Sequence, residues 1–397
     1  MAKITVINEP DGDRTPFLRG ILVQSLVNAG LTFADAYELA QKTRDGLQDN
    51  QEISNQALRE KVALLLEARF GKELRRNYEV KHKTAPGIIV HTPMRSAPFS
   101  AGILSHCLET CAIPPELALQ GARRVYASLR KSGHKEIDHK SLRRVIYRCL
   151  REHCSQETAD KYLSWRRFEN SGEALILLIG GATGTGKSTV SSELAFRMGI
   201  SRIQSTDMMR EIIRSYLTPQ VVPTLGYSSF EAWRGLPAPA EGQGLEIEDP
   251  VVTGFLSQFA AMKPALQATI ERAIKERQHL ILEGVHIVST ELEAPGKDSP
   301  GIVVPLMLAT MEKEMLGKQL RRRGREVSMH KPSRYLDNLD NIWELQSYLL
   351  SEADKAGVAI IENWYIEDTV RAILDLVMSR ITKFYLPQSD ARVWESG

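Results

Sequence analysis

The chain lacks a strong excess of either charge and has no long apolar run. Its 397 residues contain 51 Lys and Arg against 49 Asp and Glu, which gives a formal net charge of +2. This balance gives no general electrostatic reason to expect nucleic acid or a membrane surface as a partner. No apolar run approaches the length of about 18 residues that a spanning helix needs. The first residues also lack the apolar core of a signal peptide, so we expect a cytoplasmic protein.

Cysteine is scarce as well, with four residues in the whole chain. Neither the pair Cys107 and Cys111 nor the pair Cys149 and Cys154 has the two-residue spacing of common zinc knuckles. We therefore expect buried thiols rather than metal ligands. A hydrophobic fraction of 43% and a charged fraction of 25% are normal for a globular protein, and the length corresponds to roughly two or three domains.

The first 165 residues contain an internal repeat. The pattern Pro-Phe-x-x-Gly-Ile-Leu at 16–22 recurs at 98–104, an offset of 82 residues, and further on an offset of 84 carries Tyr78 to Tyr162. Each copy shows a β segment followed by apolar residues at helical spacing. The repeat predicts two successive, mainly helical modules, which we call the first module (1–83) and the second module (84–168).

Both modules share a leading β segment, P-F-x-x-x-I-L, A-x-x-x-A and a closing Tyr. In these features they resemble the ATP-cone, a small regulatory nucleotide-binding module whose nucleotide contacts lie in the leading turn. The first module has Asp11-Gly12 there, where Gly accepts the conformation that lets a phosphate approach, and the second has Met94-Arg95-Ser96. We expect at most the first module to bind a regulatory nucleotide. Both modules could instead serve packing or oligomerisation.

From 169 to 397 the pattern changes to alternating strands and helices, after a polar segment at 166–173 that we interpret as a linker. The alternation predicts an α/β domain with a parallel sheet and helices on both faces. The stretch 217–250, rich in Pro and Gly, is predicted to be a long functional insertion. The predicted strands are 174–180, 201–205, 279–283, 302–308 and 357–362.

Residues 181–188, Gly-Ala-Thr-Gly-Thr-Gly-Lys-Ser, fit G-x-x-x-x-G-K-[ST] between a predicted strand and a predicted helix, and we call them the P-loop. The glycines let backbone N–H groups surround a phosphate, and the helix places its positive end there. Lys187 supplies a charge at the β/γ oxygens and Ser188 a hydroxyl ligand for Mg²⁺, so ATP and Mg²⁺ are the predicted cofactors. The predicted nucleotide-binding residues are Gly181, Thr183, Gly184, Thr185, Gly186, Lys187, Ser188, Thr189 and, near the adenine, Asn363.

Two carboxylates end neighbouring predicted strands. Asp207 lies across the expected cleft from the P-loop, where it could accept the proton of an attacking hydroxyl, hold Mg²⁺, or simply cap a helix. Glu283 ends a buried apolar strand, the place of a second metal-linked carboxylate, and it could also act through water or on the substrate. We expect Ser188, Asp207 and Glu283 as the Mg²⁺ ligands.

Several side chains are candidates for holding a small anionic phosphorylated substrate. Arg210 and Arg214 are one helical turn apart, so they share a face that is either an anion grip or a solvated surface. Trp233 belongs to 225–233, which we expect to shape the acceptor pocket. His286 follows the third predicted strand and could bind a substrate phosphate or be an ordinary loop residue.

The segment 319–325 is strongly basic and follows the fourth predicted strand. Such a helix end is typical of the mobile lid of nucleoside-monophosphate-type kinases. Arg321, Arg322 and Arg325 would then stabilise charge on the phosphoryl group during transfer. A solvated helix is one rival interpretation. A nucleic-acid patch is another, but the segment lacks interleaved aromatic residues, so we expect no nucleic-acid partner.

Five further motifs occur in the predicted α/β domain: S-T-D-x-x-R-E-x-x-R at 205–214, V-P-T-L-x-x-S-S-F-x-A-W at 222–233, G-F-x-x-Q at 254–258, I-L-E-G-V-H at 281–286 and R-Y-L-D-N at 334–338. Together with the P-loop they resemble the 2-phosphoglycerate kinase family over most of 174–370. The resemblance implies ATP-dependent conversion of 2-phosphoglycerate to 2,3-bisphosphoglycerate. Two alternatives stay open: a related kinase acting on a phosphorylated polyol such as an inositol phosphate, and a nucleotide-sensing regulatory ATPase.

Overall fold

The chain forms two compact units, Met1–Ile89 and Val90–Gly397. The computed structural model describes residues 4–8, 13–17, 19–47, 52–82, 88–93, 96–237, 248–288, 290–292, 301–326 and 332–386. The predictions that rest on Asp11, Gly12, Met94 and Arg95 lie outside these residues. Within the described ranges, no helix is long and apolar enough to cross a membrane.

The first unit combines a small sheet with a helical cluster. Strand β1 (Thr5–Asn8) lies between β2 (Asp13–Pro16), to which it is antiparallel, and β3 (Glu52–Ser54), to which it is parallel. Leu26, Ala36 and Leu66 come from three different helices and are fully buried together, which explains the helical spacing of the apolar residues. The helices are α1 (Arg19–Ala29), α2 (Phe33–Asp45), α3 (Asn55–Phe70) and α4 (Lys72–His82).

The chain from β4 onward repeats this order of elements. Strand β4 (Ile89–His91) lies between β5 (Ser96–Pro98) and β6 (Glu136–Asp138). Tyr78 and Tyr162, which the repeat places at equivalent positions, are both buried. The internal repeat of the sequence therefore corresponds to a repeated structure. The helices are α5 (Ala101–Thr110), α6 (Pro115–Lys131), α7 (His139–His153) and α8 (Gln156–Ser171).

The four cysteines are free thiols in this repeated region. Cys111 and Cys149 are buried, and burial raises the pKa of both thiols. The prediction of buried thiols is thus confirmed for these two. It is wrong for Cys107 and Cys154, which are only partly buried.

The predicted linker at 166–173 is largely helical, because α8 continues to Ser171. Phe168 is fully buried, and its ring lies 5.8 Å from that of Tyr385, at the end of α15 (Ile366–Tyr385). Arg167 Nη1 donates to the carbonyl oxygen of Tyr385 at 3.0 Å. The polar composition of the segment conceals an apolar face that joins the second module to the rest of the second unit.

The rest of the second unit is built on a parallel sheet with the strand order β11-β10-β7-β9-β8. All seven residues of the central strand β7 are buried, as expected for a strand that is covered on both faces. The α/β class and the parallel sheet are confirmed. The strands are β7 (Ala174–Gly180), β8 (Ile203–Ser205), β9 (Leu280–Gly284), β10 (Gly301–Ala309) and β11 (Ala359–Glu362).

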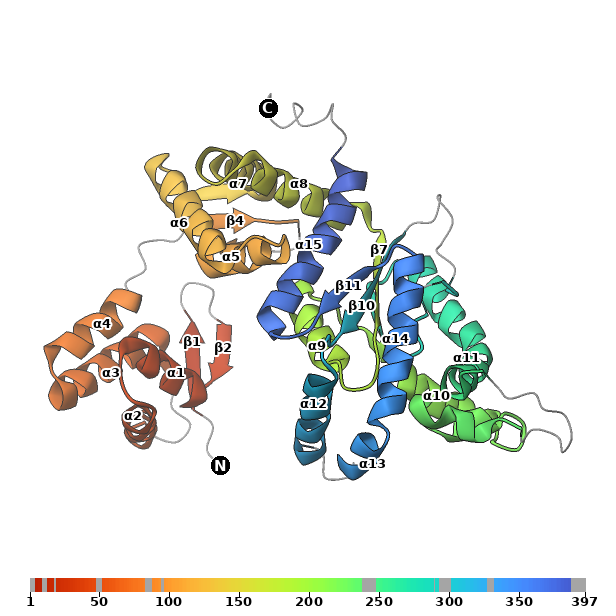
Figure 1. Cartoon of the computed structure of the whole chain (residues 1–397). Helices are drawn as coiled ribbons and strands as arrows, with labels where there is room; N and C mark the ends of the chain where they lie inside the picture. Colours follow the sequence, from red (N-terminus) through yellow and green to blue (C-terminus); the bar gives the residue numbers. More distant parts are fainter. Residues whose placement is uncertain are drawn as a thin grey trace, which may run out of the picture. The chain divides into compact units, whose positions relative to one another are not determined.

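Helices cover both faces of this sheet (Figure 1). On one face, α11 (Pro250–Lys275) and α14 (Leu339–Lys355) pack Phe255, Leu266 and Leu349 against β7 and β9. Helices α9 (Lys187–Met198) and α15 lie on the other face. The P-loop and the helix after β8 start at the carboxyl edge of the strands, where α/β sheets bind ligands. The remaining helices are α10 (Thr206–Tyr216), α12 (Lys313–Glu326) and α13 (Pro332–Asp337).

The predicted insertion at 217–250 contains two 3₁₀ helices, η1 (Pro223–Gly226) and η2 (Ser229–Gly235), before residues 238–247, which lie outside the described part. The G-F-x-x-Q motif of α11 holds them in place. Gly254 allows the close approach, because a Cβ atom there would overlap the backbone of Trp233. Gln258 Nε2 donates to the carbonyl oxygens of Thr224 at 2.6 Å and Tyr227 at 3.0 Å.

Candidate active site

The P-loop connects the end of β7 to the first residue of α9 and has the strand–loop–helix geometry that the sequence predicts. Gly181 has a φ of +145°, and a Cβ atom there would lie 2.5 Å from the carbonyl oxygen of Leu308. Gly186 has a φ of +83°, and a Cβ atom there would collide with the amide of Asn363. Glycine is required at both positions because the ends of β10 and β11 approach the loop closely.

Side chains inside and beside the P-loop hold its shape. Lys187 Nζ donates to the carbonyl oxygen of Ala182 at 2.8 Å, and the buried Thr185 hydroxyl donates to the same oxygen at 3.0 Å. Asn363 Nδ2 donates to the carbonyl oxygen of Thr185 at 2.8 Å, while its Oδ1 accepts from the Thr369 hydroxyl at 2.9 Å. Asn363 therefore braces the loop from the end of β11.

Two cavities meet at the first turn of α9, and both are lined by Lys187 and Ser188. One, which we call the carboxylate cavity, has a volume of about 510 Å³. The other, which we call the aromatic cavity, has a volume of about 520 Å³. The carboxylate cavity is also lined by Asp207, Arg210, Ser228, Glu283, Arg334 and Tyr335. The aromatic cavity is also lined by Gly186, Thr189, Arg322, Asn363, Trp364 and Tyr365.

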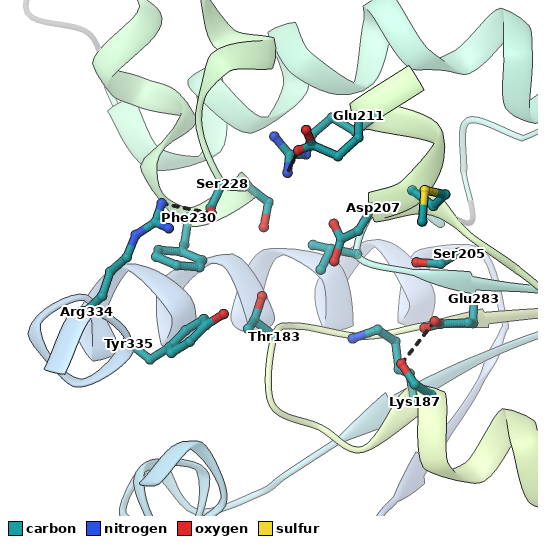
Figure 2. Close-up of a pocket in the computed structure, with 15 residues that line it drawn as sticks. Thr183, Lys187, Ser205, Asp207, Glu211, Ser228, Phe230, Glu283, Arg334 and Tyr335 are labelled. Atoms are coloured by element: carbon teal, nitrogen blue, oxygen red, sulfur yellow. Dashed lines mark hydrogen bonds and ion pairs between the residues drawn. The ribbon is translucent and has the colours of Figure 1, made fainter. Parts of the chain in front are cut away.

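Hard oxygen donors gather at the P-loop end of the carboxylate cavity. Ser188 Oγ donates to Glu283 Oε1 at 3.0 Å, and Glu283 is 5% exposed (Figure 2). Strand pairing of Ser205 with Glu283 brings the start of α10 beside the end of β9, so the Asp207 carboxylate points into the same cavity. Hydroxyl and carboxylate oxygens suit Mg²⁺, which keeps water and substrate phosphate oxygens among its ligands. The predicted set of Ser188, Asp207 and Glu283 therefore fits this ion.

The described residues contain no group of three or more His, Cys, Asp or Glu side chains that could hold a metal ion. A divalent ion at this place would accordingly depend on oxygens from a bound nucleotide. That arrangement is common where Mg²⁺ is carried by a phosphate ligand rather than by a protein cage.

Comparison with known proteins identifies related chains, although no family model matches. The chain is 36% identical over 285 residues to a 2-phosphoglycerate kinase of Pyrococcus horikoshii, which covers 72% of this chain and 91% of the relative. Similar proteins of the same name occur in Methanopyrus kandleri, with 33% identity over 72% of this chain and 85% of the relative, and in Methanocaldococcus jannaschii, with 33% identity over 74% and 92%. The chain belongs to the 2-phosphoglycerate kinase family. A 285-residue match in a 397-residue chain includes residues 113–285 wherever it begins, so the P-loop, Asp207 and Glu283 lie within the shared part.

In this family member the two arginines of α10 differ from the prediction. Arg210 lines the carboxylate cavity, but its Nη1 donates to the carbonyl oxygens of Leu225 at 3.1 Å and Tyr227 at 2.8 Å, and its Nη2 pairs with Glu211 at 2.7 Å. Arg214 pairs with the same carboxylate at 2.6 Å and is not among the residues that line the cavity. Arg210 is therefore at the cavity with both Nη groups engaged by the insertion and Glu211, and the binding of an acceptor by Arg210 and Arg214 stays a prediction.

The structure also corrects the prediction for His286, because the side chain of this residue has no exposed surface. Its Nε2 donates to Gln258 Oε1 at 2.8 Å, since the Gln258 amide nitrogen is occupied as a donor to backbone carbonyls. Its Nδ1 then accepts from the Thr206 hydroxyl at 3.1 Å. Burial lowers the pKa of His286 to about 4, so the ring is neutral near pH 7. The prediction that His286 binds a substrate phosphate is wrong; it anchors the residue that precedes Asp207.

The predicted lid arginines lie at the end of α12. Arg322 lines the aromatic cavity, whereas Arg321 is exposed and lines neither cavity. The side chain of Arg325 lies outside the described residues. Trp233, predicted to contact the substrate, is 36% exposed but packs beside α11 and does not line the carboxylate cavity.

Sequence reasoning missed several residues that the structure brings to the cavities. Arg334 and Tyr335 reach the carboxylate cavity from α13, opposite Ser228 of the insertion. Trp364 and Tyr365, which are 49% and 65% exposed, line the aromatic cavity. The R-Y-L-D-N motif at 334–338 could have indicated Arg334 and Tyr335. Trp364 and Tyr365 could have been found from their position just after the last strand of the sheet.

Proposed function

We propose that the protein transfers the γ-phosphoryl group of ATP to the free hydroxymethyl group of 2-phosphoglycerate, which yields ADP and 2,3-bisphosphoglycerate. The observation that carries the proposal is that Lys187 and Ser188 line both cavities. A nucleotide in the aromatic cavity and an acceptor in the carboxylate cavity would therefore meet at the P-loop. The names of the archaeal relatives support 2-phosphoglycerate as the acceptor.

The aromatic cavity suits the nucleotide. The exposed rings of Trp364 and Tyr365 offer faces on which an adenine can stack. Arg322 provides a positive charge in the same cavity, where the phosphates would leave the P-loop. The start of α9 presents backbone N–H groups and the positive end of the helix to these phosphates.

The carboxylate cavity supplies the groups for phosphoryl transfer. Asp207 would accept the proton of the hydroxymethyl group while the hydroxymethyl oxygen attacks the γ-phosphorus of ATP. The bond between that phosphorus and the oxygen that bridges it to ADP then breaks. Lys187 would stabilise the charge that develops on the transferred group and on the leaving oxygen. Mg²⁺, when bound near Ser188, Asp207 and Glu283, would neutralise phosphate charge. Glu283 already accepts from Ser188, which orients that hydroxyl at the cavity wall.

We also propose that residues 1–83 and 84–168 are ATP-cone-like modules ahead of a kinase domain at 169–397. The shared order of a β-hairpin, two helices, a short strand and two helices supports the likeness of the modules to each other. A regulatory nucleotide on the first module and oligomerisation through the modules remain part of this proposal. In the second module, a cavity of about 280 Å³ with largely apolar walls lies between β4, α5, α7 and α8.

An ATP-consumption assay with a panel of acceptors tests the proposed function. We expect 2-phosphoglycerate to stimulate ADP formation, with 2,3-bisphosphoglycerate as the phosphorylated product identified by mass spectrometry. Stimulation by an inositol phosphate and not by 2-phosphoglycerate would favour a polyol-phosphate kinase. ATP turnover that no acceptor changes would instead indicate a nucleotide-sensing ATPase.

A further inference from the structure

The end of the carboxylate cavity that faces away from Lys187 is built from two segments that are far apart in sequence. One is the start of η2, which contributes Ser228 and Phe230, and the other is α13, which contributes Arg334 and Tyr335. Figure 2 shows Arg334 reaching from α13 toward Ser228, with Asp207 between this end and the P-loop. An acceptor whose hydroxyl lies near Asp207 would place its far end here.

Arg334 is held in one orientation by a buried carboxylate. Its Nε donates to Glu231 Oε2 at 3.0 Å, and its Nη2 contacts the same oxygen and donates to Ser228 Oγ at 3.1 Å. Glu231 is only 5% exposed, whereas the Arg334 side chain is 51% exposed. Because a buried carboxylate needs a charged partner, this pairing fixes the guanidinium plane at the cavity wall. The Nη1 group makes no hydrogen bond to any of the described residues.

The charges around Glu231 leave this end of the cavity positive. Arg234, which does not line the cavity, has its Nη1 3.5 Å from Glu231 Oε1, so two guanidinium groups share one carboxylate. Arg210, the other arginine of the cavity, has Nη1 engaged by two backbone carbonyls and Nη2 by Glu211, and its Nε is buried. Arg334 is thus the cavity arginine that has a donor left, Nη1, on a side chain that is half exposed, whereas the Arg210 side chain is 11% exposed.

We propose that Arg334, together with the Ser228 hydroxyl, binds an anionic oxygen group of the acceptor, and that Glu231 is a positioning residue that orients the Arg334 guanidinium. This inference rests on the proposed function and assigns the acceptor-binding arginine to α13 rather than to α10.

The first test replaces Arg334 by Gln and by Lys and measures KM for ATP and for 2-phosphoglycerate. We expect Arg334→Gln to raise the acceptor KM by about 10- to 100-fold, because one charge-assisted hydrogen bond is lost, and to change the ATP KM by less than about threefold. Lys keeps the charge without the planar fork, so Arg334→Lys should recover only part of the loss. The matched control is Arg234→Gln, which also removes an ion pair of Glu231 but lies outside the cavity; its acceptor KM should stay near that of the wild type.

The second test separates two roles of Arg334: binding of the acceptor, and neutralisation of the buried Glu231 carboxylate. Arg334→Gln leaves a buried carboxylate with less compensation and could lower stability, and the double variant Arg334→Gln/Glu231→Gln removes that charge. We expect the double variant to regain the wild-type melting temperature while its acceptor KM stays high. Recovery of the wild-type acceptor KM in the double variant, or an equal rise in Arg234→Gln, would overturn the proposal.

A third test distinguishes which anionic group Arg334 contacts and keeps the inference separate from the proposed function. Glycerol 2-phosphate retains the phosphate and lacks the carboxylate, whereas glycerate retains the carboxylate and lacks the phosphate. The probe whose calorimetric affinity falls in Arg334→Gln shares the contacted group, and unchanged affinity for 2-phosphoglycerate and both probes would contradict the inference. A wild-type protein that binds 2-phosphoglycerate through Arg334 but transfers no phosphoryl group would defeat the proposed function alone. Normal transfer with unchanged KM in the Arg334 variants would defeat the inference alone.

Discussion

We predict that replacing His286 by Gln flattens the acid arm of the pH–stability curve. The neutral His286 ring lies without exposed surface between Gln258 and Thr206, and burial lowers its pKa from 6.5 to about 4. The unfolded chain therefore binds a proton between these pH values that the folded protein does not. The contribution of the neutral His286 ring to the free energy of unfolding is therefore complete above pH 6.5 and is lost as the pH falls toward 4.

The size of the effect follows from this pKa difference. The whole shift corresponds to about 3 kcal/mol of unfolding free energy, of which about 2 kcal/mol is lost between pH 7 and pH 5. Gln can keep a hydrogen bond in this place without a titrating ring. The variant should therefore be less stable than the wild type at pH 7 and should lose about 2 kcal/mol less between pH 7 and pH 5.

Urea unfolding followed by tryptophan fluorescence measures this difference. Every tryptophan lies at or beyond Trp165, so the signal reports the second unit and not the first. His153→Gln is the matched control, because His153 is exposed at the end of α7 and its replacement should leave the pH dependence unchanged. Parallel stability curves for the wild type and His286→Gln would refute the argument, since they would mean that His286 takes up its proton equally well in the folded protein.

The remaining predictions concern the P-loop, the neighbouring strand end and the modules. Lys187→Ala should lower turnover at least about a hundredfold with an unchanged circular dichroism spectrum, because the lysine stabilises transition-state charge. Ser188→Ala should raise the Mg²⁺ concentration for half-maximal activity about tenfold, measured by Mg²⁺ titration. Gly284→Ala should lower the unfolding free energy by at least about 2 kcal/mol in urea, since its φ is +152° and a Cβ atom would overlap Thr206. In Lys187→Ala, calorimetry should find at most one nucleotide site per chain, and removal of residues 1–80 should abolish it.

The sheet and the P-loop could be predicted closely because their signals are local. The central strand 174–180 coincides with β7, and the other predicted strands begin or end within two residues of the observed ones. The apolar run predicts the strand. The glycines, Lys and Ser that follow it predict the tight loop that leads into the next helix. The segment 166–173 was interpreted as a linker because its charged residues are frequent, whereas α8 continues to Ser171 and buries Phe168 within it.

The contacts of the site residues could not be read from local spacing. A separation of four residues places Arg210 and Arg214 on one face of α10, but it does not show that this face meets Leu225 and Tyr227 of the insertion. Arg334 lies 103 residues beyond its partner Glu231, so their pairing depends on how α13 and η2 pack. His286 was misread for the same reason: its partner Gln258 comes from α11.

The second module contacts the α/β part of the second unit at α9, the helix that follows the P-loop. Thr110 Oγ1 donates to the carbonyl oxygen of Arg197 at 2.9 Å, and the rings of His106 and Phe196 lie 6.0 Å apart. Arg197 and Phe196 lie on α9, the helix that begins with Lys187. Helix α5 therefore contacts the same helix that carries the P-loop lysine. The match to the archaeal relatives also includes residues 113–168, so part of this module is common to the family. Whether the second module serves only packing stays a prediction, and these contacts place its α5 against the helix that begins at the P-loop.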